Sequence, residues 1–430
     1  MSEAAPARRI GKRLLRLGAI FTAILLVALL IVGWLLQPQR AGAFLLKQVG
    51  SSLGLSISAR AIDYRLRGTP QLVLRDVVAT RPGDATALLR AERVFVSLPW
   101  RTIRARGNDL TVQRVELDAP VLDLPALQRW LATRPATAET RIPTLVDGLR
   151  ITRGRIDNDD WRIEGLSIDV PSLDPERLLR ARVRGRYLAP PMSIPADLAI
   201  AVAHPRRALA GKRTGIAGVG TVTVANPDWQ VASQVFLAGP LRLGKDSALV
   251  KPVRLGIAAR YRSASTTLPF RLGLHGPMVF NNATWRFVPA SLFLDGDGAV
   301  PNAVARGSVS VGRRLVLHLD GRIASWPDAW PVLPAPLSAS TSPMPFALDY
   351  KGAIDFADLA SLELKRDETR FDARFRLPAV LAWLDADATG SPPLPPLQGR
   401  LSTPRIEIAG ATLEGVEVEL DDPGIPPKAK

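Results

Sequence analysis

The sequence predicts a mainly β protein, with one N-terminal transmembrane helix followed by a long, mostly antiparallel sheet and a few short helices. Two observations support this prediction. An uncharged apolar run covers residues 17–36, and from residue 55 onwards apolar and polar residues alternate in short runs. Alternation with period two is typical of strands that bury one face. The expected helices are each shorter than about a dozen residues, which is too short for the crossovers of a parallel sheet.

The apolar run at 17–36 has the length that a helix needs to cross a bilayer. Its 20 residues contain no charged side chain, and Thr22 is its one polar residue. At about 1.5 Å per residue, such a helix spans the roughly 30 Å of the hydrocarbon core. We therefore predict a membrane anchor, whose representative residues are Leu17, Ile24, Leu30, Trp34 and Leu36.

The flanking charges predict the orientation of this helix. Five basic residues precede it, against the single acid Glu3, whereas only Arg40 and Lys47 follow closely. Cytoplasmic flanks carry the excess of Lys and Arg, so the N-terminus is expected in the cytoplasm and the bulk of the chain across the membrane. The residues that set this topology are Arg8, Arg9, Lys12, Arg13 and Arg16. The alternative is a cleaved signal peptide, because Ala41-Gly42-Ala43 has the small-x-small pattern of a cleavage site.

Composition limits the classes of function. With 430 residues and 47% hydrophobic residues, the chain can bury a core. It has no cysteine, which excludes disulfides, thiolate nucleophiles and cysteine metal sites. The net charge of +16 favours anionic partners. No basic run with interleaved aromatic residues occurs, so we expect anionic lipid headgroups or surface glycans and no nucleic acid; an ordinary solvated basic surface is the alternative.

The strand-like runs are separated by turn residues, such as the Pro-Gly pair at 82–83. The clearest runs are 71–74, 93–98, 111–117, 149–152, 161–164, 220–224, 308–311, 315–319, 405–408 and 415–420. The expected helices are 125–132, 174–180, 355–362 and 379–384.

Proline clusters predict the boundaries between regions, because proline removes a donor from a strand ladder. The expected regions are a cytoplasmic basic tail (1–16), the transmembrane helix (17–36), a first β region (41–325), a proline-rich connection (326–346) and a C-terminal β region (347–430) with a proline-rich insertion at 391–397.

Several segments resemble the AsmA-like family of bacterial envelope proteins. They follow the basic tail and the single N-terminal helix, and the resemblance is clearest over residues 10–190. The segments are SSLGLSI (51–57), PQLVLRDV (70–77), LLRAERVFVSL (88–98), VELDAPVLDL (115–124), LRITRGRID (149–157) and AGATLEGVEV (409–418). They are patterns of apolar alternation and contain no catalytic signature.

The resemblance implies an inner-membrane protein whose periplasmic part is a long curved sheet with an apolar groove, similar to the repeating β-groove lipid-transfer proteins. Members are associated with phospholipid movement towards the outer membrane and with its assembly, so the expected ligands are phospholipid acyl chains. The candidate groove-facing residues are Val94, Val96, Leu72 and Leu74. Alternation alone does not distinguish the face of Val94 and Val96 from the face of Phe95, nor a groove from an ordinary sandwich core.

The sequence indicates no catalytic, cofactor or metal site. The three histidines His204, His275 and His318 lack metal-pair spacing, and the Asp295–Gly298 turn lacks the distant Glu of a calcium loop. No nucleophile elbow, phosphate-binding loop or dinucleotide fingerprint occurs. We therefore expect no enzymatic activity. The alternative to lipid holding is an envelope scaffold that binds a protein partner by strand addition.

Overall fold

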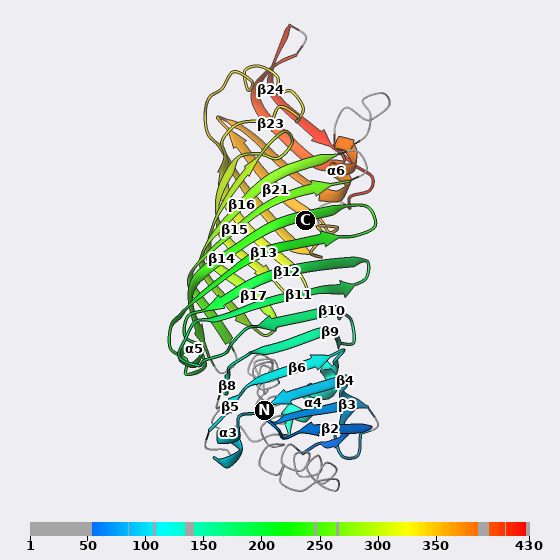
Figure 1. Ribbon diagram of the computed structural model, residues 1–430. Helices are drawn as coiled ribbons and strands as arrows, with labels where there is room; N and C mark the ends of the chain where they lie inside the picture. The colour runs from blue at the N-terminus through cyan, green and yellow to red at the C-terminus, as the bar shows by residue number, and fades with distance from the viewer. Residues whose placement is uncertain are drawn as a thin grey trace, which may run out of the picture. The chain divides into compact units, whose positions relative to one another are not determined.

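The computed structural model describes residues 54–84, 86–105, 109–133, 142–244, 247–263, 266–385, 395–408 and 410–426. Long antiparallel strands dominate these residues, with a few short helices (Figure 1). The predicted mainly β fold, a long and mostly antiparallel sheet with a few short helices, is therefore confirmed for this part of the chain. The basic tail 1–16, the predicted transmembrane helix 17–36 and residues 391–394 of the proline-rich insertion lie outside the described residues.

The described residues fall into two compact units. The first comprises those of Met1–Pro227 and Ala238–Ala248, and the second those of Asp228–Leu237 and Leu249–Lys430. The first unit holds β1 (Ser56–Ser58), β2 (Ala61–Arg65), β3 (Gln71–Thr80), β4 (Ala87–Ser97), α3 (Trp100–Arg104), β5 (Thr111–Val112), β6 (Arg114–Asp118), β7 (Val121–Asp123), α4 (Leu124–Ala132), β8 (Thr144–Leu145), β9 (Leu149–Asp157), β10 (Arg162–Val170), β11 (Leu179–Ala189), β12 (Met192–Val202), α5 (Pro205–Leu209) and β13 (Thr214–Ala225).

The remaining elements are assigned in the same way. The second unit holds β16 (Thr267–Asn281), β17 (Thr284–Gly296), β18 (Ala303–Val311), β19 (Leu315–Ile323), β20 (Met344–Gly352), β21 (Ala360–Arg366), β22 (Thr369–Phe375), α6 (Leu377–Asp385), β23 (Leu397–Ile408) and β24 (Ala411–Leu420). Strands β14 (Gln230–Leu243) and β15 (Ser247–Arg262) have residues in each unit. The predicted proline-rich connection 326–346 lies inside the second unit.

The sheet of the first unit is antiparallel except around β9. Strands β1 and β2 both pair with β3, which pairs with β4, and β4 pairs with β6 and β7. Strand β9 then runs parallel to β6 and β7, and helix α4 lies in the connection that this parallel pairing needs. From β9 to β13 each strand pairs antiparallel with the next.

Helix α4 closes a core over the first strands of this sheet. Asp123 caps the helix, since its carboxylate accepts a hydrogen bond of 2.7 Å from the Ala126 amide. Leu127 and Trp130, exposed by 1% and 2%, pack with buried side chains of β3, β4 and β7. A second closed core forms among β4, α3, β5, β6, β8 and β9, in which Val112, Val115 and Leu145 have no exposed surface.

In the second unit each strand from β16 to β24 pairs antiparallel with the next. The register puts an apolar ladder on one face of β19 to β24. Representative pairs are Leu319 with Leu348, Leu364 with Phe371, and Leu401 with Val418. Charged residues alternate with them on the opposite face.

Two of the four expected helices are confirmed and two are wrong. Residues 125–132 and 379–384 fall within α4 and α6. Residues 174–180 form a turn followed by the start of β11, and 355–362 a turn followed by the start of β21. In each turn an aspartate accepts a hydrogen bond from the amide two residues later, at Asp174 and at Asp355. This local bond satisfies the backbone without a helix.

Candidate functional site

Strands β11 and β12 carry a continuous apolar ladder on one face. The paired residues are Leu179 with Val202, Ala181 with Ile200, Val183 with Leu198 and Tyr187 with Ile194. Each of these side chains is only half-buried, and neither strand contains a fully buried residue. The ladder continues on the flanking strands, where Ile168 of β10 lies opposite Val183 and Ile216 of β13 lies opposite Val202. We call this the apolar face of β10 to β13.

The opposite face of β11 is charged. Four arginines alternate along β11 and are all exposed: Arg180, Arg182, Arg184 and Arg186. Asp197 of β12 accepts hydrogen bonds from Arg182 at 2.9 Å and from Arg184 at 2.8 Å. These bonds, first from Arg182 and then from Arg184, lower the pKa of Asp197 well below its usual value. The sheet therefore has one polar face suited to water and one half-covered apolar face.

The residues predicted to face a groove lie elsewhere, on β3 and β4. Register pairs Leu72 with Val96 and Leu74 with Val94, so all four share one face. Leu72, Leu74 and Val96 are exposed by at most 4% and pack in the two closed cores, with Val94 packed partly against both. The expectation that they line a groove is thus corrected, because α4 and the neighbouring strands already cover this face. Phe95 lies on the other face, where the Arg93 guanidinium is 5.3 Å from its ring centroid.

The apolar face of the second unit is partly filled by its own chain. Trp326 and Trp330, in the proline-rich connection, meet edge to face with ring centroids 4.9 Å apart. They pack against the cluster that contains Ile323, Met344 and Leu364. Both indole N–H groups donate hydrogen bonds of 2.9 Å, from Trp326 to the Pro331 carbonyl and from Trp330 to the Ala299 carbonyl. These tryptophans thus anchor the connection to the sheet.

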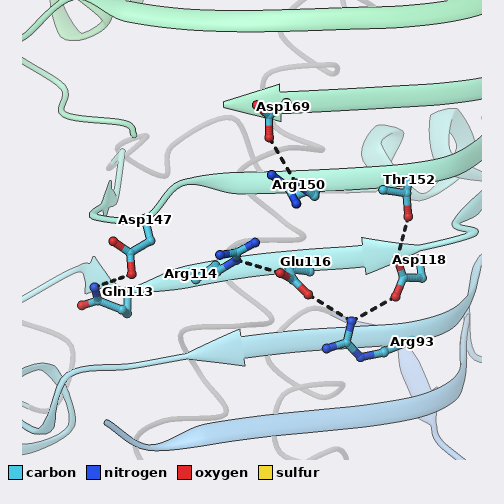
Figure 2. A network of polar contacts seen from close by, with 9 residues as sticks. All are labelled: Arg93, Gln113, Arg114, Glu116, Asp118, Asp147, Arg150, Thr152 and Asp169. Carbon is cyan, nitrogen blue, oxygen red and sulfur yellow. Dashed lines mark hydrogen bonds and ion pairs between the residues drawn. The ribbon is translucent and has the colours of Figure 1, made fainter. Parts of the chain in front are cut away.

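A polar network crosses β4, β6, β9 and β10 on the outer face of the first unit (Figure 2). Arg93 donates hydrogen bonds of 3.0 Å to both Glu116 and Asp118, and Thr152 donates one of 2.6 Å to Asp118. Arg114 completes the row at 2.7 Å from Glu116. The pKa of Asp118 is lowered, first by the Thr152 hydrogen bond and then by Arg93, against the opposing effect of burial. Burial alone would lower the pKa of Arg93, but its two carboxylate partners raise it.

A shallow, open depression of about 490 Å³ lies over this network. Its lining residues are Thr69, Gln71, Arg93, Phe95, Ser97, Gln113, Arg114, Glu116 and Asp147. Every charged group drawn in Figure 2 already has a polar partner, including Asp147, which accepts a hydrogen bond of 2.6 Å from Gln113. The network therefore joins strands, and half-exposed ion pairs of this kind contribute about 0–1 kcal/mol each. Alternating charges at 114, 116 and 118 are the sequence signal that could have located it.

No group of three or more metal-binding side chains occurs among the described residues. The His318 Nδ1–H donates a hydrogen bond of 2.5 Å to the Asp349 carboxylate across β19 and β20, on the charged face. His204 contacts the Glu176 carbonyl at 2.8 Å. Both histidines thus have a protein partner.

In the part of the chain that the structure describes, no helix combines the length and apolarity needed to cross a membrane.

Comparisons of the chain with protein-family models, with curated proteins and with solved structures find no match.

Proposed function

We propose that this protein is anchored in the bacterial inner membrane by residues 17–36 and holds or conducts phospholipid acyl chains on the apolar face of β10 to β13. On this proposal the bulk of the chain is periplasmic and serves outer-membrane lipid homeostasis and envelope assembly. It performs no chemistry of its own. The observation that carries the proposal is the half-buried ladder of Val183, Leu198 and their neighbours, which alternates with exposed arginines on the same strands.

The energy of acyl-chain exposure explains why such a face would be needed. Each CH₂ group exposed to water costs about 0.8 kcal/mol, so a tail of roughly sixteen carbons costs on the order of 12 kcal/mol. A lipid that leaves a bilayer therefore needs continuous apolar cover. A twisted sheet with one apolar and one charged face provides such cover while it stays soluble.

Three features of the sequence support the same proposal. The predicted anchor with its basic flank would place the sheet on the outer side of the inner membrane. The resemblance to the AsmA-like family joins this topology to lipid movement between membranes. The net charge of +16 also suits a protein that works beside anionic lipid headgroups.

Two adjacent residues of β12 provide a matched test. Leu198 belongs to the apolar face, whereas Ala199 is exposed on the charged face opposite Arg182. We expect Leu198→Asp to lower the amount of co-purifying phospholipid several-fold, because a buried charge beside an acyl chain is costly. Ala199→Asp adds the same charge but should leave the lipid content unchanged.

Lipid would be extracted from both variants and from the unaltered chain and quantified by mass spectrometry. Circular dichroism and urea denaturation would show that each variant is folded. Equal lipid content in the two folded variants would contradict the proposal.

The second candidate is an envelope scaffold, and it is favoured by the exposure of β24. This strand pairs with β23 from Gly399–Leu420 to Ile408–Ala411 and is the last strand of the second unit's sheet (Figure 1). Leu413 and Val418 on it are exposed by 46% and 37%. A strand at the end of a sheet can accept a strand from a partner.

Two single proline variants test this candidate. Successive amides of a strand point to opposite edges, so of Glu417→Pro and Val418→Pro only one removes a bond to β23. The other keeps the backbone bonds to β23, loses one side-chain contact with that strand and should leave the fold stable. If the protein is a scaffold, this stable variant should no longer co-purify with its protein partner from cells. Its lipid content does not bear on this test. Retained binding would remove this candidate.

A further inference from the structure

Two connections lie side by side at one edge of the first unit. They are residues 171–178, between β10 and β11, and residues 203–213, between β12 and β13, which include α5. The Arg206 amide donates a hydrogen bond of 2.9 Å to the Pro175 carbonyl, and the Arg206 guanidinium lies 2.9 Å from Glu176. Helix α5 lies at the edge where β12 ends and β13 begins (Figure 1). We call these two connections the α5 edge.

The α5 edge is basic. Residues 203–213 contain Arg206, Arg207, Lys212 and Arg213 and no acidic residue. Arg206 is paired with Glu176, and Arg177 with Asp174. Arg207, Lys212 and Arg213 are exposed and have no side-chain partner among the described residues. Three exposed cations therefore gather on one short connection.

Exposed leucines accompany these cations. Pro205 and Ala208 form the buried side of α5, so Leu209 is turned outwards and is exposed by 48%. Leu178, in the adjoining connection, is exposed by 49%. Two large apolar side chains therefore protrude beside the exposed cations. Basic residues together with protruding leucines are the composition of segments that bind at membrane interfaces.

We propose that the α5 edge docks on an anionic phospholipid surface, with Arg207, Lys212 and Arg213 among the headgroups and Leu178 and Leu209 in the acyl boundary. The charge complementarity of the three exposed cations selects this partner, and the leucines distinguish it from a soluble anion. The docking stands whether or not the apolar face of β10 to β13 holds lipid. If both hold, this edge is where a bilayer meets the strands that carry the ladder.

A fluorescent probe at position 209 tests the docking in the full chain. Because the chain has no cysteine, Leu209→Cys gives a single site for an environment-sensitive nitrobenzoxadiazole label. The labelled chain would be placed in nanodiscs of neutral phosphatidylcholine and titrated with protein-free vesicles that contain phosphatidylglycerol. A second arm would include phosphatidylglycerol in the nanodisc itself. We expect a blue shift and increased emission in at least one arm and none with phosphatidylcholine vesicles.

Two charge variants and a second label position serve as controls. Removal of three cations in the combined variant Arg207→Gln, Lys212→Gln and Arg213→Gln should weaken the response on the order of 100-fold in lipid concentration. The matched variant Arg254→Gln, Arg260→Gln and Arg262→Gln removes three exposed charges from β15 and should leave it unchanged. A label at Val332→Cys, a position exposed by 91% in the second unit, should not respond.

The proposal is overturned by no response at position 209 in either arm, by an equal response to neutral vesicles, or by a response that survives removal of the three cations. The phospholipid content of the same triple variant distinguishes a failure of docking from a failure of the proposed lipid holding. Loss of the vesicle response with retained phospholipid assigns the defect to the α5 edge alone.

Discussion

Gly220 of β13 lies where the neighbouring strand approaches too closely for a side chain. A Cβ atom at this position would lie 2.0 Å from the Asp197 carbonyl oxygen, whereas one at Gly218 would meet its nearest atom, the Ala199 carbonyl oxygen, at 4.0 Å. We expect Gly220→Ala to lower the free energy of unfolding by more than about 2 kcal/mol, because backbone must move. Gly218→Ala should change it by less than about 0.5 kcal/mol. Urea denaturation measures both, and equal effects would refute the close approach.

The contact between His318 and Asp349 makes a pH-dependent contribution to stability. The Asp349 hydrogen bond, followed by its charge, raises the pKa of His318 above 6.5. A group whose pKa is raised by folding stabilises the fold fully at pH values below the pKa that it has in the unfolded chain. This stabilisation is lost as the pH rises through the pKa of the folded state. The loss in free energy of unfolding caused by Asp349→Asn should therefore be larger at pH 5.5 than at pH 8.5.

Proton NMR checks the same contact directly, because the chain has only three histidines and His318→Asn assigns the resonance. We expect the pKa of His318 to fall in Asp349→Asn. An unchanged titration would show that the contact is not formed in solution.

At the residue scale the sequence predicts which side chains share a face of a strand, but not what covers that face. It places Leu72, Leu74, Val94 and Val96 on one face, and the structure agrees. What covers that face depends on α4, which directly follows β7 in the chain and packs against β3 and β4. The half-covered ladder of β11 and β12 has the same pattern in sequence as the closed cores. Pattern alone therefore did not locate the candidate site.

At the element scale the proline-rich connection is an anchored part of the second unit. We expect Trp330→Ala to lower the free energy of unfolding by about 2–4 kcal/mol, since it removes the edge-to-face contact and a half-buried indole. Trp330→Phe keeps an aromatic ring but loses the hydrogen bond to the Ala299 carbonyl, so it should lower the free energy of unfolding by about 1 kcal/mol. Denaturation that finds Trp330→Ala no more destabilised than Trp330→Phe would show that the ring does not pack.

Short elements are where the sequence predicts least. Helix α4 was predictable, because Asp123 and Pro125 mark its start and the apolar period of 125–132 follows. The turns at Asp174 and Asp355 carry the same aspartate signal, since a side chain that caps a helix also caps a turn. Helices α3 and α5 have five residues each and give no helical period, so the α5 edge was visible only as scattered basic charge.

At the scale of the whole molecule, the account depends on whether the chain carries lipid at all. The alternation, the half-buried ladder and the predicted anchor all agree with a lipid-holding sheet. A fully packed sandwich would produce the same alternation, and only the occupant of the apolar face distinguishes the two.

Native mass spectrometry of residues 41–430, produced in the bacterial periplasm and purified without detergent, tests this claim most directly. Lipid extraction from the same sample identifies what is bound. We expect at least one diacyl phospholipid per chain, lost in Leu198→Asp and retained in Ala199→Asp. A folded protein that carries no lipid would contradict lipid holding and leave the scaffold function as the remaining proposal.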